Sequence, residues 1–249
     1  MRIVSLPIGS TEDRVIGSLD IEKAIEKGQR ALQPGLLAEA NQNILYIDEV
    51  NLLPDHITDS ILDAAASGWN TVEREGISVS HPSRFILIGT MNPEEGELRP
   101  QLSDRFSLHI TVEGIYDVEQ RVEIIKRNLE FNENPAEFLD KWSMEQDELK
   151  TKIMDARKKL GEITVPTNLL RAVALGCIEL HVDGHRPDIA TIRAAKALTS
   201  LSNRAEVTKE DIMQVVVMAV GHRSRGFGFE EPAKPSEIRE TFSRILETG

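Results

Sequence analysis

Two adjacent carboxylates, Asp48 and Glu49, are the side chains of this sequence whose types and spacing point most directly to chemistry. They follow an apolar run at residues 44–47, so they stand where a buried strand would end. One carboxylate in such a position can hold Mg²⁺, and its neighbour can orient and deprotonate a water molecule. This is the Walker-B arrangement of nucleotide hydrolases. A buried strand followed by a solvated acidic turn explains the same residues equally well.

A second apolar run leads to a polar residue in the same way. Residues 85–90 form this run, and Asn92 follows it. An amphipathic helix is predicted between the two runs, at residues 57–65. Short runs of branched aliphatic residues predict parallel strands that are covered on both faces. The order strand, helix, strand predicts a parallel βαβ unit, which brings Asn92 to the same sheet edge as Asp48 and Glu49.

The remaining pattern predicts a fold of the α/β class followed by an all-α domain. Short alternating segments around Gly76 predict a β-hairpin inserted before the second strand, and residues 108–112 predict a last short strand. From there on the periodicity is helical, which predicts domains at residues 1–114 and 115–249. Helices are predicted at residues 21–28, 34–41, 118–129, 149–160, 167–181, 187–202 and 208–221, with a final short helix after an irregular segment at 226–232.

Composition excludes several classes of function. With 249 residues, 40% of them hydrophobic, the chain can form one large or two small domains with a real core. The net charge of -12 opposes unaided binding to nucleic acid or to an anionic membrane. Cys177 is the only cysteine, so no internal disulfide can form and a reducing compartment is expected. Residues 1–4 lack the apolar core of a secretory signal, and no run approaches a membrane span, so we expect a cytoplasmic protein.

Four segments taken together resemble one known family. They are residues 9–14, residues 34–37, the strand that ends in Asp48 and Glu49, and residues 92–106. The resembled family is the magnesium-chelatase I subunit, a branch of the AAA+ ATPases, and the similarity runs in unbroken order to the tail. AAA+ ATPases are ring-forming motors in which a nucleotide lies between neighbouring subunits. Members of this family power insertion of Mg²⁺ into protoporphyrin IX.

The resemblance implies a fold, cofactors and partners. The fold would be a truncated AAA+ sheet domain with a β-hairpin insert, followed by a helical lid. The cofactors would be ATP and Mg²⁺. The partners would be further copies of the chain in a homo-oligomeric ring, together with D-type and H-type chelatase subunits, and neither nucleic acid nor membrane.

The resemblance also implies a role for each of five residues. Asp48 would hold the Mg²⁺ of Mg·ATP, usually through water, and Glu49 would orient and deprotonate the attacking water. Asn92 corresponds to sensor 1, where a neutral amide can bind the γ-phosphate or that water. Arg105 matches the arginine finger that reaches into the adjacent subunit's site, because a guanidinium stays charged and grips phosphate in a bidentate fork. Arg186 falls where the family has sensor 2, on the lid.

Structural readings compete with two of these roles. Asn92 also fits an amide that caps the turn before Pro93. Arg186 also fits a surface arginine that balances nearby aspartates. On weaker grounds, Glu97 and Arg99 are expected to line the interface between subunits.

The chain departs from the family in one respect. A P-loop ends in Gly-Lys-Ser or Gly-Lys-Thr, and none of the 16 glycines here is followed by lysine. The family carries its P-loop upstream of the matching segment, with the first strand and helix of the sheet. We therefore expect little or no ATP hydrolysis by this chain alone, whether it is a fragment, starts too late or is half of a split protein.

Two other functions remain open on the sequence. The missing P-loop favours a non-enzymatic scaffold that joins a ring and presents surfaces to a partner. The third reading is a MoxR-like AAA+ ATPase that remodels or metallates another enzyme. Five intact residues favour a motor over a scaffold, because these groups share no purpose without nucleotide: Asp48, Glu49, Asn92, Arg105 and Arg186.

Overall fold

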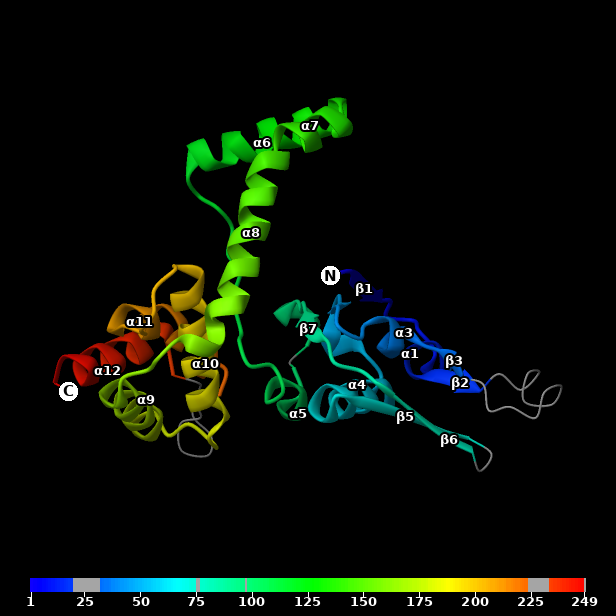
Figure 1. Ribbon diagram of the computed structural model, residues 1–249, viewed down its shortest axis with the longest axis horizontal. Helices are drawn as coiled ribbons and strands as arrows, with labels where there is room; N and C mark the ends of the chain where they lie inside the picture. Colours follow the sequence, from blue (N-terminus) through cyan, green and yellow to red (C-terminus); the bar gives the residue numbers. More distant parts are fainter. Residues whose placement is uncertain (20–31, 75–76, 97, 224–232, 249) are drawn as a thin grey trace. The chain divides into compact units, whose positions relative to one another are not determined.

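The computed structural model describes residues 1–19, 32–74, 77–96, 98–223 and 233–248, which form two compact units, Met1–Phe106 and Ser107–Gly249. We call them the N-terminal and C-terminal units and describe each by itself (Figure 1). Three of the predictions made from the sequence lie outside the described residues. They are the helix at residues 21–28, the irregular segment at 226–232 and the interface role of Glu97. The predicted domain boundary at residue 114 falls in the segment 104–117, which has neither helix nor strand, and it stays a prediction.

A parallel sheet of three strands forms the centre of the N-terminal unit, in the order β1-β4-β7. Its strands are β1 (Ile3–Leu6), β4 (Ile44–Ile47) and β7 (Ile86–Gly89). The predicted βαβ unit is confirmed, because β4 and β7 pair in parallel and α4 (Asp55–Ser67) lies between them in the chain. The predicted hairpin is also confirmed, as β5 (Trp69–Arg74) and β6 (Ile77–Pro82). The unit also contains α1 (Glu12–Ile16), β2 (Gly17–Leu19), β3 (Leu32–Pro34), α3 (Leu36–Glu39), η1 (Val50–Leu52), η2 (Pro93–Glu95) and α5 (Pro100–Ser103).

The prediction that the strands are covered on both faces is wrong for the N-terminal unit. The face that carries Leu45 and Ile47 is buried against α3 and α4. On the opposite face, Ile3, Ile86 and Ile88 are 68%, 52% and 43% exposed. Successive right-handed crossovers that run in one direction place their helices on the same side of a sheet. The described helices of this unit therefore cover only one face.

The predicted strand at residues 108–112 is also wrong. Its side chains include Ile110 and Val112, which are 63% and 90% exposed, and the segment pairs with no described strand. The backbone N–H of His109 instead donates to the carbonyl of Met218 at 2.8 Å. Alternating apolar residues form a strand only where a neighbouring edge accepts their hydrogen bonds.

The C-terminal unit is helical, as predicted. The helices predicted near 167–181, 187–202 and 208–221 are α9 (Thr167–Glu179), α10 (Arg186–Leu201) and α11 (Lys209–Val220). With α12 (Pro235–Thr248) they enclose a core around Val173, Ile212 and Phe242. Gly176 is required at its position, because a Cβ there would lie 2.5 Å from the buried Phe242 ring. The final helix is longer than the short helix expected.

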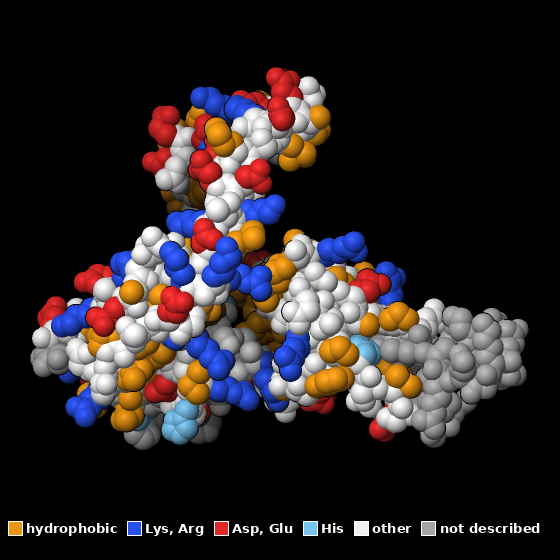
Figure 2. Space-filling view, in the orientation of Figure 1, with side chains coloured by type: hydrophobic (Ala, Val, Ile, Leu, Met, Phe, Trp, Pro, Cys, Tyr) orange, Lys and Arg blue, Asp and Glu red, His pale blue; other side chains and the backbone are white. Residues whose placement is uncertain are grey.

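Three further helices of the C-terminal unit form an arm, which comprises α6 (Val118–Glu133), α7 (Pro135–Lys141) and α8 (Ser143–Lys159). The short η3 (Leu160–Glu162) follows α8. None of the arm's residues is buried, and Figure 2 shows hydrophobic side chains lying open between its charged ones. The helices predicted at residues 118–129 and 149–160 correspond to α6 and α8, whereas α7 was not predicted. Ile125 and Leu149, on the predicted apolar faces, remain 58% and 48% exposed. None of the described helices is long and apolar enough to span a membrane.

Asp211 ties the first turn of α11 to α10. Its carboxylate accepts hydrogen bonds from the Arg204 guanidinium at 2.8 Å, from the Thr199 hydroxyl at 2.9 Å and from the Thr208 N–H at 2.9 Å. Burial alone would raise the pKa of Asp211, but these hydrogen bonds outweigh it and hold the pKa to about 2, below the usual 3.8. The unfolded chain thus binds the proton more readily than the folded one.

We expect this carboxylate to stabilise the C-terminal unit at pH values above about 4 and to lose that effect as the pH falls toward 2. The shift corresponds to roughly 2 kcal/mol. Hydrogen exchange of α11 amides, measured on the wild type and on Asp211→Asn across this pH range, checks the prediction. The variant should exchange faster at neutral pH and approach the wild type near pH 2. A difference that does not shrink with acidification would contradict it.

Candidate functional site

The chain turns sharply where β4 ends. Glu49 adopts a left-handed backbone conformation, with φ 52° and ψ 54°, immediately before η1. Thr90, just past the end of β7, holds this turn through its backbone: its N–H donates to the Ile47 carbonyl at 3.0 Å, and its carbonyl accepts from the Val50 N–H at 2.8 Å. Backbone hydrogen bonds from the neighbouring strand therefore fix the turn that carries both acids.

The Asp48 carboxylate is exposed at this edge and is already hydrogen-bonded. Its Oδ1 accepts from the Thr90 hydroxyl at 2.5 Å and from the Tyr46 hydroxyl at 3.1 Å. The Glu49 N–H donates to the same Thr90 hydroxyl at 3.2 Å. The structure thus brings Asp48 and Glu49 together with two residues that the sequence reasoning missed.

The sequence contained a signal for Tyr46 but not for Thr90. Tyr46 stands two positions before Asp48, so it lies on the same side of an extended strand. The register that pairs Ile47 with Gly89 brings Thr90 level with Asp48 one step further along. The strand spacing could have identified Tyr46, but Thr90 required the register.

Asn92 lies two residues beyond Thr90, on the same loop. Its side-chain oxygen accepts from the Glu94 N–H at 3.2 Å, so it caps η2. The structure therefore contains the capping contact that we gave as the alternative role of Asn92. The Asn92 side chain is nevertheless exposed. Its role as sensor 1 stays a prediction.

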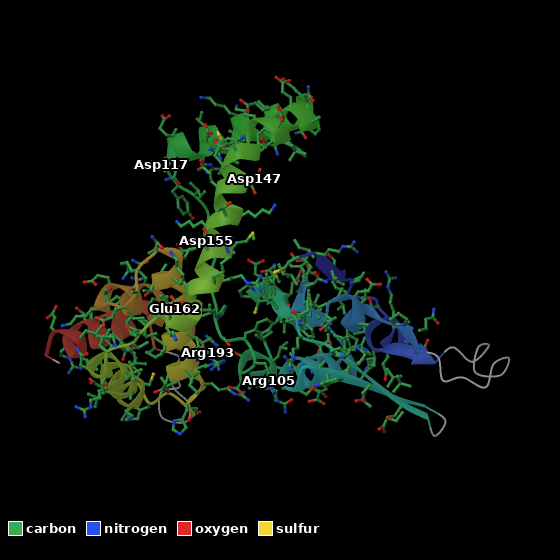
Figure 3. The ribbon with its side chains drawn as sticks, viewed as in Figure 1. Arg105, Asp117, Asp147, Asp155, Glu162 and Arg193 are labelled. Atoms are coloured by element: carbon green, nitrogen blue, oxygen red, sulfur yellow. The ribbon has the colours of Figure 1, made fainter. Side chains whose placement is uncertain are left out.

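The next two candidates follow this loop. Arg99 donates to the Leu53 carbonyl at 3.0 Å and to the Thr58 hydroxyl at 3.1 Å, and it forms an ion pair with Asp55. It therefore ties the start of α5 to the start of α4, a contact within its own unit. Arg105 follows α5 and is exposed (Figure 3), and no described acidic side chain pairs with it. Within the described part of the chain, this exposed guanidinium is therefore available to bind another group.

Arg186 is the first residue of α10, with Pro187 in the second position, where its fixed backbone suits the start of a helix. Its side chain is exposed. Because Arg186 belongs to the C-terminal unit and Asp48 to the N-terminal one, their approach stays a prediction.

The donor set at the β4 edge fits Mg²⁺ better than a transition metal. Among the described residues no group of three or more His, Cys, Asp or Glu side chains could enclose an ion. Mg²⁺ is usually held by one or two carboxylates together with water and substrate phosphates. The Asp48 carboxylate, held in place and exposed, meets that requirement.

Two family models match the chain. The one described as magnesium chelatase, subunit ChlI, matches residues 21–105, and the AAA lid domain matches residues 171–245. Among curated proteins, the magnesium-chelatase subunit ChlI homolog of Methanocaldococcus jannaschii is 57% identical over 96% of this chain and 66% of its own length. The ChlI subunits of Euglena gracilis and Anabaena variabilis are each 51% identical, over 98% and 99% of this chain.

The chain belongs to the magnesium-chelatase ChlI family. It spans 70% of the Euglena gracilis protein and 73% of the Anabaena variabilis protein, against 66% of the archaeal one. The family resemblance expected from residues 9–14, 34–37 and 92–106 is therefore confirmed.

Two solved structures add to the comparison. A chain in a cryo-EM-based model of the BchI–BchD complex of magnesium chelatase is 45% identical, with a TM-score of 0.45, over 96% of this chain and 72% of that chain. A crystal structure of a Cytophaga hutchinsonii protein is 19% identical, with a TM-score of 0.64, over 98% of this chain and 76% of that chain. The second match agrees with the predicted AAA+ fold. A parallel sheet domain followed by a helical lid is thereby confirmed for this ChlI-family chain.

Proposed function

We propose that this chain is the ATPase motor subunit of a magnesium-chelatase-type complex, which drives Mg²⁺ insertion into protoporphyrin IX. The observation that supports it most is the β4 edge. There the Thr90 hydroxyl binds both the Asp48 carboxylate and the Glu49 backbone N–H, in a chain of the ChlI family. The cofactors are ATP and Mg²⁺.

Five residues of the chain have separate roles in this function. Asp48 binds the Mg²⁺ that accompanies ATP, and this ion neutralises charge on the phosphates when bound. Glu49 takes a proton from the attacking water, and the amide of Asn92 orients that water or the γ-phosphate. Arg105 extends to the nucleotide of an adjacent subunit, and Arg186 contacts nucleotide from the lid.

The partners follow from the family. As an arginine finger, Arg105 contacts the nucleotide bound by a neighbouring subunit, and this role requires a homo-oligomeric ring. D-type and H-type chelatase subunits complete the complex. The net charge of -12 supports a complex without nucleic acid.

ATP turnover tests this function directly. We compare the chain alone with the complemented chain, by which we mean this chain fused after a P-loop segment of the ChlI family. We expect turnover only in the complemented chain, because the phosphates need the amides and lysine of a P-loop. Inactivity of a folded complemented chain would contradict the proposal.

A non-enzymatic ring scaffold is the second candidate, favoured by the absence of a Gly-Lys pair. It predicts assembly with D-type subunits without ATP turnover, even in the complemented chain. A MoxR-like chaperone predicts turnover that a client metalloenzyme stimulates and protoporphyrin-bound H-type subunits do not. The same turnover assay, run with each partner, separates the three functions.

A further inference from the structure

The side-chain amide of Asn51 is buried without a hydrogen-bond partner. Asn51 belongs to η1, which begins directly after Glu49. The amide has two N–H groups that donate and an oxygen that accepts, yet no described residue bonds to its buried Nδ2 or Oδ1. A buried polar group that makes no hydrogen bond destabilises a fold, so such groups are rare in native proteins. The position of this amide therefore requires an explanation.

The unpaired polar groups of the N-terminal unit lie at one edge of its sheet. Among the described residues of this unit, only Ser10 and Asn51 have buried side-chain N or O atoms without a partner. Ser10 lies in the loop after β1, and Asn51 lies in the turn after β4. Both segments leave the carboxyl edge of the sheet, which also carries the acidic pair. Proteins leave such groups unpaired mainly where function requires it, so this edge indicates a functional role.

A loop with few hydrogen bonds lies beside the Asn51 amide. We call residues 92–96 the η2 loop. Its described hydrogen bonds stay within the loop, as in the bond from the Glu94 N–H to the Asn92 side chain. A Cβ on Gly96 would lie 3.9 Å from Asn51 Nδ2, and the Gly96 φ of 131° is accessible mainly to glycine. A loop with so few bonds to its surroundings can rearrange at low cost.

We propose that Asn51 is a positioning residue whose amide binds the backbone of the η2 loop near Gly96 when ATP occupies the site. Asn92 contacts the γ-phosphate or the attacking water in the proposed function, so ATP acts on this loop directly. The new bond pairs the buried amide, and this gain favours the rearranged loop. Because η1 follows Glu49 and the η2 loop begins at Asn92, the bond sets the position of the sensor 1 residue relative to the base. This inference rests on the proposed ATPase function.

Hydrogen exchange of the β4 amides in this chain tests whether the Asn51 amide is unpaired. Asn51→Leu keeps nearly the same shape and removes both polar atoms, so we expect these amides to exchange about tenfold more slowly. Asn70→Leu is the matched control, because the buried Asn70 amide donates to the Ile16 carbonyl at 2.8 Å and contacts the His81 ring at 2.9 Å. The same substitution at this paired amide should make exchange faster.

ATP turnover of the complemented chain tests the positioning role. We expect Asn51→Leu to lower the single-turnover rate about tenfold, while the affinity for Mg·ATP stays near the wild-type value. Asn51→Ala also removes the amide and should show the same loss of rate. Asn70→Leu should keep the wild-type rate in the molecules that are folded. A residue that serves only stability gives a different pattern, because its loss destabilises the fold and leaves the rate of the folded molecules unchanged.

Three outcomes separate this inference from the proposed function. If the complemented wild type does not hydrolyse ATP, the proposed function fails and this inference fails with it. If the wild type hydrolyses ATP and Asn51→Leu keeps its single-turnover rate, only this inference is wrong. If Asn51→Leu makes the β4 amides exchange faster, as Asn70→Leu does, the Asn51 amide is already paired in the free chain, and this inference is overturned whatever the rate.

Discussion

Glu49→Gln is expected to lower ATP turnover of the complemented chain about a thousandfold while Mg·ATP binding stays near the wild-type level. Glutamine keeps the size of the side chain and its place in the turn, but it cannot take a proton from water. The left-handed turn at Glu49 is held by backbone bonds to Thr90, which this substitution leaves in place. The loss should therefore fall on the chemical step, measured as single-turnover rate beside nucleotide affinity.

Two controls define what this result means. Glu95→Gln removes an exposed carboxylate on η2 of the same unit and should leave turnover unchanged. Asp48→Asn should lose Mg²⁺-dependent nucleotide binding as well as turnover, because it removes the metal ligand. Loss of a general base is expected to lower turnover by at least about 10²-fold. If Glu49→Gln retains a tenth or more of the wild-type turnover, Glu49 is not the base.

Arg105→Ala is expected to lower turnover of the assembled ring by about 10³- to 10⁵-fold, the effect expected of an arginine finger. The side chain is exposed and has no described acidic partner, so its removal should not destabilise the unit. Arg105→Lys should remain strongly impaired, because an ammonium keeps the charge but not the bidentate fork. The melting temperature of each variant checks that the unit stays folded.

Mixing of inactive subunits tests whether the finger acts between subunits. In an equal mixture of Arg105→Ala and Glu49→Gln subunits, half of the sites take an intact Glu49, and half of those take an intact Arg105 from the neighbour. Turnover should therefore recover to roughly a quarter of the wild-type value if subunits mix at random in a head-to-tail ring. Replacing the Glu49→Gln subunit with the double variant Glu49→Gln, Arg105→Ala should abolish recovery. Equal turnover in both mixtures would exclude a finger acting in trans.

Helical periodicity predicted the C-terminal unit well. The residues of α9, α10 and α11 bury one face each against a common core, so their spacing alone carried the information. The same periodicity in α6 and α8 predicted the helices but not their exposure. Spacing identifies which side chains share a face, and it does not identify what covers that face.

For the strands, the local sequence pattern was not enough to predict which segments pair. Residues 44–47 and 86–89 form strands because they pair with each other, while the equally apolar residues 108–112 find no described strand to pair with. Burial on one face rather than two also depended on where the crossover helices lie. Both outcomes depend on residues far away in the chain, which local pattern does not contain.

The sequence by itself determined the family, the acidic pair at the end of a strand and the absence of a Gly-Lys pair from these 249 residues. It did so because these features are local, or are spread along the chain in an order that can be compared directly. Only the tertiary structure decided that Thr90 and Tyr46 bind the same oxygen of Asp48. Thr90 lies 42 residues from Asp48, and only the register between β4 and β7 brings its hydroxyl to the carboxylate.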